Sequence, residues 1–192
     1  NPSVADVPRA VDVEGCVAFS PDGLTSVGGF TGNDEEGAVK FRQVNGPKMF
    51  EDFVAAAKWL KARPESSGKL AAIGFCFGGG LGFNVAAHLE AEGSAPLDAL
   101  VSYYGSALPG LHDVMTVTAP SLHHFGLSDS FIDTETVRRI EASVTQQQDT
   151  VVETYAGADH AFDNDDMPWH HPEASALAGA RADEFLRERP PR

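Results

Sequence analysis

Short apolar runs alternate along the chain with segments whose apolar residues recur at helical spacing. The runs have the length of β-strands and end in Gly, Pro or Asp, which is typical of buried parallel strands; they cover residues 16–20, 70–75, 97–104, 121–127 and 150–156. Helices are predicted over 48–62, 79–91, 134–148 and 173–188. Strands that alternate with helices predict an α/β fold, in which helices flank a mostly parallel sheet.

Residues 21–47 form a longer, Gly-rich connection between two of these elements. Long Gly-rich segments of compact domains often line a functional site, and a solvated surface loop is the alternative. A chain of 192 residues has the length of one ordinary domain, so residues 1–192 are expected to form a single domain.

Composition narrows the classes of partner. The chain has 28 Asp and Glu against 14 Lys and Arg, a formal charge of −14. Such a surface repels phosphate backbones and anionic lipid, and no apolar run approaches the ~20 residues of a membrane span, so neither nucleic acid nor a membrane is expected as a partner. Cys16 and Cys76 cannot build a disulfide framework, and the first residues lack a signal-peptide pattern, which together favour a cytoplasmic location. The composition leaves open whether the chain forms a homodimer.

The sharpest local signal is the sequence Gly74-Phe75-Cys76-Phe77-Gly78, which joins a predicted strand to a predicted helix. This is the G-x-nucleophile-x-G pattern of a nucleophile elbow, with cysteine in the usual serine position. The flanking glycines are expected because side chains would clash in so tight a turn. The Phe77 N–H then faces a developing oxyanion, and the start of the helix favours a thiolate at Cys76. A buried structural cysteine is the alternative.

A thiol nucleophile needs a base, and the base needs an orienting acid. In α/β hydrolases these follow in the order nucleophile, acid, histidine, each after a later strand. Asp129 follows the run 121–127 and His160 follows the run 150–156. Taken singly, Asp129 fits a helix N-cap and His160 fits a surface histidine. Taken together and in this order, they predict a triad with Cys76, whereas Cys16 is expected to be a packing residue.

The other histidines do not indicate a metal site. His123 and His124 point to opposite faces of a predicted strand, and His170 and His171 lie in a polar, Pro-containing loop. The motifs C-x-x-C and H-E-x-x-H are absent, and the glycines at 78–80 lack the Lys-Ser/Thr of a phosphate-binding loop. No metal and no cofactor are therefore expected.

The stretches GKLAAIGFCFGGG, FGLSDSF and YAGADHAFDND resemble the dienelactone hydrolase family, cysteine-dependent members of the α/β-hydrolase fold. The similarity extends from about Val4 to Phe185. It implies a carboxylic ester hydrolase for lactones or small esters, with Cys76 as nucleophile, His160 as general base and Asp129 as its orienting partner. The Phe77 N–H would be one oxyanion donor. An aromatic substrate pocket is a further interpretation, with core packing as its alternative; its candidates are Phe75, Tyr103, Tyr104 and Phe162.

The chain departs from this family's pattern in two places. Dienelactone-specific members hold the substrate carboxylate with arginines, one of them shortly after the catalytic histidine. Here Asn164 stands among acidic residues, which disfavour an anionic substrate, and Lys40 or Arg42 are the candidate replacements. The family also begins with further strands, one of which carries the second oxyanion donor. We therefore expect a substrate other than dienelactone, and a chain that lacks the first strands of the fold.

Two other functions remain open. Class I glutamine amidotransferases also place a cysteine at a strand–helix elbow, followed later by His-Pro-Glu, and this chain contains His171-Pro172-Glu173. That motif lies in a polar segment rather than at the end of an apolar strand, which argues against this function. A truncated hydrolase acting as a non-catalytic binding protein is the other alternative, and the presence of Cys76, Asp129 and His160 argues against it.

Overall fold

The computed structural model describes residues 17–189. The chain divides into two compact units, with the boundary between Gly68 and Lys69. Each unit is described by itself, and the expectation that both belong to one domain stays a prediction.

In its described part, residues 17–68, the first unit contains three helices: η1 (Thr25–Val27), α2 (Asp34–Phe41) and α3 (Gly46–Lys61). Both α-helices begin after an asparagine whose side chain accepts a first-turn N–H: Asn33 from Glu36 and Asn45 from Lys48, each at 3.0 Å. Helix α2 lies within residues 21–47, which the sequence pattern presents as a loop. Its apolar pattern is weak, but its cap and its acidic first turn stabilise the N-terminus.

The strand expected over residues 16–20 is wrong for the part that the structure describes. Residues 17–20 carry no strand, and Cys16, with its expected packing role, lies outside the described residues. The Phe19 side chain is half-exposed, and its ring centroid lies 5.2 Å from that of Trp59 in α3. An apolar run becomes a strand only where a neighbouring strand accepts its backbone hydrogen bonds, and no described strand pairs with residues 17–20.

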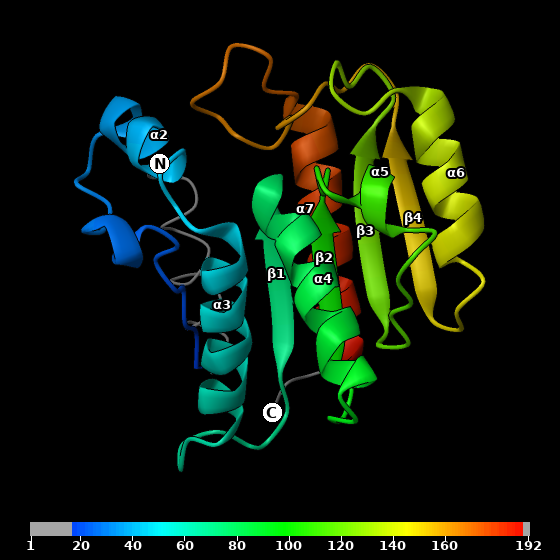
Figure 1. Cartoon of the computed structure of the whole chain (residues 1–192). Helices are drawn as coiled ribbons and strands as arrows, with labels where there is room; N and C mark the ends of the chain where they lie inside the picture. The colour runs from blue at the N-terminus through cyan, green and yellow to red at the C-terminus, as the bar shows by residue number, and fades with distance from the viewer. Residues whose placement is uncertain (1–16, 190–192) are drawn as a thin grey trace. The chain divides into compact units, whose positions relative to one another are not determined.

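The second unit is a four-stranded parallel sheet with helices in the connections (Figure 1). The strands lie in chain order: β1 (Ala71–Phe75), β2 (Ala99–Tyr103), β3 (Ser121–Gly126) and β4 (Thr150–Tyr155). The helices are α4 (Phe77–Ala91), α5 (Leu108–Leu111), α6 (Thr134–Val144) and α7 (Pro172–Glu188). The predicted α/β class is confirmed, as are these strands and the helices α3, α4, α6 and α7. The single turn α5 is too short to show a helical period.

Both faces of the sheet are covered. Val101 of β2 packs in one apolar cluster with residues of α7. Leu100 and Ser102, on either side of Val101, face α4 instead. A Cβ on Gly82 would lie 3.2 Å from the Leu100 side chain, and a Cβ on Gly79 would lie 2.6 Å from Ser102 Oγ. Helices α4 and α7 therefore lie on opposite faces of the sheet (Figure 1). Burial on both faces explains why the strands read as continuous apolar runs.

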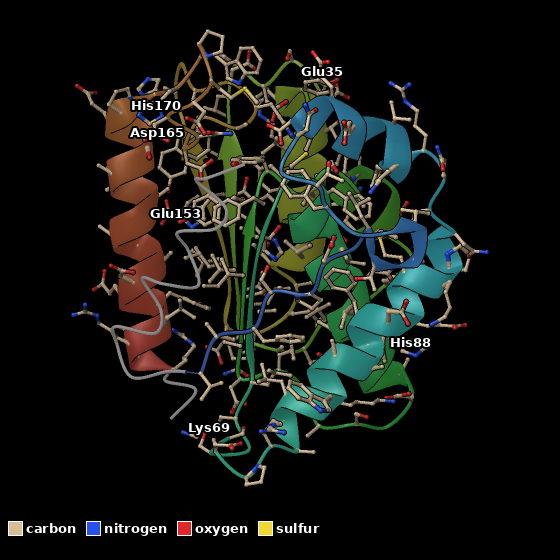
Figure 2. The ribbon with its side chains drawn as sticks, turned by 90° about the vertical axis from the view of Figure 1, so that its left-hand side faces the viewer. Glu35, Lys69, His88, Glu153, Asp165 and His170 are labelled. Carbon is tan, nitrogen blue, oxygen red and sulfur yellow. The ribbon has the colours of Figure 1, made fainter. Side chains whose placement is uncertain are left out.

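The parallel register brings the carboxyl ends of the strands together. Phe75 pairs with Tyr103, and Gly126 pairs with Tyr155. The loops that follow the four strands therefore start at one edge of the sheet, which is where open α/β sheets bind ligands. Within β4, Glu153, labelled in Figure 2, forms an ion pair with Arg181 of α7 at 2.9 Å, which ties the last strand to its covering helix.

Across residues 17–189, none of the helices has the length and apolar character that a bilayer crossing requires.

Candidate active site

Cys76 occupies the turn between β1 and α4. Its backbone has φ 52° and ψ −114°, a strained conformation for a residue other than glycine. A Cβ on Gly74 would lie 2.2 Å from the Gly78 carbonyl oxygen, whereas a Cβ on Gly78 would meet nothing within 4 Å. The expectation that steric crowding requires both flanking glycines is therefore right for Gly74 and wrong for Gly78. The crowded positions that follow are Gly79 and Gly80, which approach the segment after β2.

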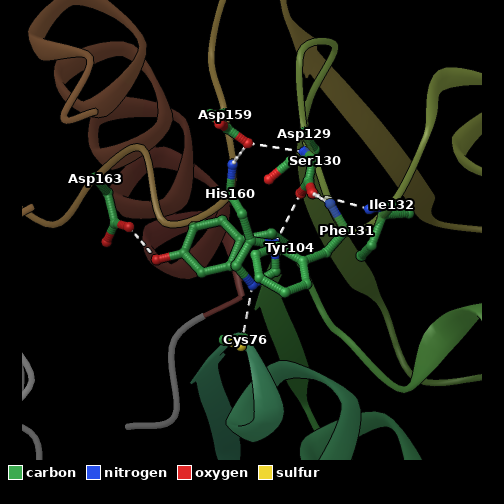
Figure 3. Close-up of polar contacts among 9 residues, drawn as sticks. All are labelled: Cys76, Tyr104, Asp129, Ser130, Phe131, Ile132, Asp159, His160 and Asp163. Carbon is green, nitrogen blue, oxygen red and sulfur yellow. Dashed lines mark hydrogen bonds and ion pairs between the residues drawn. The ribbon is translucent and has the colours of Figure 1, made fainter. Parts of the chain in front are cut away.

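The loops after β3 and β4 bring an aspartate and a histidine to this thiol (Figure 3). His160 Nε2 lies 3.0 Å from Cys76 Sγ, and His160 Nδ1 lies 2.8 Å from Asp129 Oδ2. The Asp129 side chain is fully buried, and the His160 side chain is 10% exposed. The three residues thus form one hydrogen-bonded chain, which is the arrangement of a nucleophile, a base and an orienting acid.

The thiol and the imidazole shift each other's pKa. Burial by itself raises the pKa of the Cys76 thiol, but the hydrogen bond and charge of His160, together with the Phe77 amide, bring it below its ordinary value. Burial by itself lowers the pKa of His160, but hydrogen bonds to Asp129 and Cys76 raise this pKa to about 9. These opposite shifts favour a thiolate beside an imidazolium, which is the reactive state of a cysteine nucleophile.

Asp129 is oriented by its own loop. Its Oδ1 accepts the backbone N–H groups of Phe131 at 2.7 Å and Ile132 at 2.8 Å, which leaves Oδ2 for His160. Helix α6 is capped by Asp133, whose side chain accepts a first-turn N–H. The N-cap alternative for Asp129 is therefore wrong for α6, because a second aspartate takes that position.

Asp159 joins the two loops that carry the acid and the base. Its Oδ1 accepts the Ser130 N–H at 2.8 Å and the His160 N–H at 2.7 Å (Figure 3). These backbone hydrogen bonds, that of His160 first, lower the pKa of Asp159. The sequence pattern does not single out this residue, and its position directly before His160 is the one signal that it offers.

Two aromatic rings contact the His160 imidazole. The Tyr104 and Phe131 ring centroids each lie 4.9 Å from that of the imidazole. Tyr104 is buried and its hydroxyl donates a hydrogen bond to Asp163, whereas Phe131 is 78% exposed (Figure 3). Tyr104 has φ 38°, and Ala161 beside the histidine has φ 57°. Strained backbone of this kind is characteristic of functional sites.

The aromatic residues suggested as a substrate pocket lie largely in the core. Tyr103, Tyr104 and Phe162 are buried in the apolar cluster under α7. Phe75 packs against this cluster, with its ring stacked on that of Tyr103 at 4.7 Å. Their burial favours the core-packing alternative for these residues, with Tyr104 also in contact with the candidate base.

Two further histidines, His123 and His124, make local hydrogen bonds in the sheet. His123 is buried with its Nε2 3.2 Å from Ser121 Oγ, and His124 Nδ1 lies 2.8 Å from the Tyr155 hydroxyl. His170 lies near Asp165 in the loop before α7 (Figure 2). In residues 17–189 no group of three or more His, Cys, Asp or Glu side chains could hold a metal ion.

The parallel sheet, the helices on both of its faces and the cysteine at the strand–helix turn define an α/β hydrolase. The profile of the dienelactone hydrolase family matches residues 2–189. The chain belongs to this family, so the expected family and the α/β-hydrolase fold are confirmed.

Two carboxymethylenebutenolidases are among its relatives. One, from a Pseudomonas species, is 30% identical over 199 residues, which cover 100% of this chain and 81% of the relative. Carboxymethylenebutenolidase 1 of Cupriavidus pinatubonensis is 28% identical over 153 residues, which cover 79% of this chain and 62% of the relative. The crystal structure of a dienelactone hydrolase-like promiscuous phosphotriesterase from metagenomic libraries is similar with a TM-score of 0.60 and 25% identity, covering 75% of this chain and 63% of that one. The chain thus spans less than two thirds of the last two proteins.

Proposed function

We propose that this chain hydrolyses lactones or small carboxylic esters through a thioacyl intermediate on Cys76. The observation that carries the proposal is the hydrogen-bonded chain from Cys76 Sγ through His160 to Asp129, with distances of 3.0 and 2.8 Å. Membership of the dienelactone hydrolase family and the two carboxymethylenebutenolidase relatives support this substrate class.

Acylation begins when the Cys76 thiolate attacks the carbonyl carbon and forms a C–S bond. The carbonyl oxygen becomes an oxyanion, and the Phe77 N–H, which already helps to lower the thiol pKa, is the proposed donor to it. Collapse of the oxyanion breaks the C–O bond, while imidazolium His160 gives its Nε2 proton to the departing alkoxide. A lactone opens in this step without losing its alcohol part.

Deacylation reverses these roles. Neutral His160 accepts a proton from water, and the resulting hydroxide attacks the thioester carbonyl. The C–S bond breaks, which releases the carboxylic acid and returns the thiolate. Asp129 holds the imidazole in the tautomer that presents Nε2 to the thiol, and it stabilises the imidazolium in both steps. This chemistry requires no cofactor.

An uncharged substrate fits the site better than an anionic one. Asp163 and Asp165 flank Asn164, shortly after His160, in the neighbourhood where the family resemblance leads us to expect an arginine in dienelactone-specific members. The Asp163 carboxyl accepts a hydrogen bond from the Tyr104 hydroxyl, and the Tyr104 ring contacts the base, so a substrate carboxylate would approach an acidic side chain. We infer esters or lactones other than dienelactone as substrates, and a higher rate with a neutral ester than with its carboxylate-bearing analogue tests this.

The amidotransferase alternative required catalytic roles for His171 and Glu173. Instead, His171 Nδ1 accepts the Ala174 N–H at 3.2 Å as the N-cap of α7, and Glu173 lies in the first turn of this helix. The hydrogen bond of the thiol to His160 therefore favours the hydrolase. The non-catalytic alternative is disfavoured by the hydrogen-bonded chain from Cys76 through His160 to Asp129, an arrangement that a purely binding protein does not need.

A panel of nitrophenyl esters and lactones tests the proposal. The wild-type protein should release a burst of nitrophenol equal to the enzyme concentration, followed by steady turnover, whereas Cys76→Ala should release none. His160→Ala should abolish turnover, and Glu173→Ala, the matched control in the His-Pro-Glu motif, should retain it. Loss of turnover in Glu173→Ala alone would refute the assignment.

The proposed ligand is thus a small ester or lactone. We infer a cytoplasmic location from the two cysteines, which cannot build a disulfide framework, and cell fractionation would test this. A homodimer would be detected by sedimentation of the purified chain.

A further inference from the structure

We propose that the Phe131 ring is the binding surface for the alcohol part of the substrate, and that it selects esters with an aryl leaving group. The inference rests on the proposed ester hydrolysis and adds a specificity-determining residue to it. Phe131 lies in the loop between β3 and α6, two residues after the candidate acid.

The position of the ring beside the base carries this inference. To take up the Nε2 proton, the leaving oxygen must lie within about 2.6–3.2 Å of His160 Nε2. The substituent on that oxygen then lies within a few ångströms of the imidazole. The Phe131 centroid is 4.9 Å from the imidazole centroid with the planes inclined at 54°, so an aryl group on this oxygen reaches the Phe131 ring.

The two rings at the imidazole differ in what they can still contact. Tyr104 is buried and engages Asp163, so its ring is occupied by the protein. Phe131 leaves 78% of its surface exposed, which makes it available to a substrate. An aromatic face with this exposure offers stacked or edge-on contacts to another ring, and these are stronger than its contacts with a short alkyl chain.

The backbone of Phe131 has a separate role that substitution retains. Its N–H donates to Asp129 Oδ1 at 2.7 Å, and any residue other than proline keeps this donor. The exposed ring contributes little to the core, so Phe131→Ala should fold normally. The rate at which iodoacetamide alkylates Cys76 should be unchanged in this variant, because that rate reports the thiol and its imidazole and not the alcohol site.

Nitrophenyl acetate and the acetate of a non-aromatic alcohol differ in the leaving alcohol but form the same acetyl-enzyme. Comparing them therefore separates acylation from deacylation. Phe131→Ala should lower kcat/KM for the aryl acetate about two- to tenfold. It should leave the other acetate within about twofold of wild type, and it should leave deacylation of the shared acetyl-enzyme unchanged. Phe131→Tyr should retain the aryl preference. Val114→Ala is the control, because Val114 is 71% exposed and lines a pocket with Ser121 and Thr150, where β3 and β4 begin.

An equal fall with both acetates, or slower deacylation, would overturn the inference and assign Phe131 to the positioning of His160. An unchanged aryl rate would overturn it as well. Failure of the proposed function gives a different result: the wild-type protein would hydrolyse neither acetate above the rate of Cys76→Ala.

Discussion

Gly74 and Gly78 occupy matching positions in the G-x-Cys-x-G motif, but the structure predicts opposite responses to alanine. A Cβ on Gly74 would lie 2.2 Å from the Gly78 carbonyl oxygen and 2.6 Å from the Gly79 nitrogen. Ordinary contacts begin near 3.4 Å, so the backbone must move by about 1 Å. Overpacking of this kind costs about 1–3 kcal/mol of unfolding free energy, with more where backbone opposes backbone.

The same displacement reaches the chemistry, because Gly74 and Gly78 flank Cys76. The Cys76 Sγ to His160 Nε2 distance is 3.0 Å, and a misplacement of about 1 Å at reacting groups costs on the order of 100-fold in rate. A Cβ on Gly78 meets nothing within 4 Å, and this residue lies in the first turn of α4. Alanine is the better helix former by up to about 1 kcal/mol, so Gly78→Ala should match or exceed wild-type stability.

Urea unfolding and kcat/KM for nitrophenyl acetate, measured on both variants, provide the test. Gly74→Ala should unfold at a lower urea concentration and lose about two orders of magnitude in kcat/KM. Gly78→Ala is the matched control, since it adds the same methyl group to the same motif. Equal losses in the two variants, or a wild-type midpoint and rate for Gly74→Ala, would refute the steric reasoning.

Three further predictions concern titration and orientation. Alkylation of Cys76 by iodoacetamide should titrate below the ordinary pKa of a free thiol, and His160→Ala should move this titration upward, because burial then acts without the opposing imidazole. Asp129→Asn should lower kcat by about 10⁴-fold through the wrong imidazole tautomer, as measured in steady-state assays. As the pH falls from 6.5 to about 4, the wild-type protein should lose unfolding free energy, measured by urea titration at each pH. His123→Gln should make this loss smaller. Burial lowers the pKa of His123 to about 4, so in this pH range the unfolded chain binds a proton that the folded chain does not. The unfolding free energy then changes by at most about 1.4 kcal/mol per pH unit because of this group.

Each of these predictions has a contradicting result. An alkylation pKa that His160→Ala leaves unchanged would mean that the imidazole does not activate the thiol. Asp129→Asn with wild-type kcat would remove the orienting role of this carboxylate. A pH slope that is the same in wild type and His123→Gln would show that another group unfolds the protein in acid.

The sequence by itself determined the alternation of strands and helices in the second unit and the order of its candidate triad. These features are encoded locally. Each strand run is apolar throughout because both faces of the strand are buried. The elbow is recognisable within five residues of sequence because its turn has no room for a side chain at Gly74. The chain order of Cys76, Asp129 and His160 then matches loops that a parallel sheet must place at one edge.

Only the tertiary structure decided which of several similar residues serves which role. The sequence pattern suggests Asp129 as a cap, but the structure gives that position to Asp133, and His160 and His171 both follow the elbow cysteine. The strand register brings Asp129 to His160 across 31 residues of chain and His160 to Cys76 across 84. Motif order in the sequence predicts these partners, but the contacts themselves depend on how the sheet places the loops. The exposure of Phe131 and the burial of Tyr104 depend in the same way on how neighbouring loops pack at the ends of β2 and β3, because solvent access is a property of the packed surface rather than of the residue type.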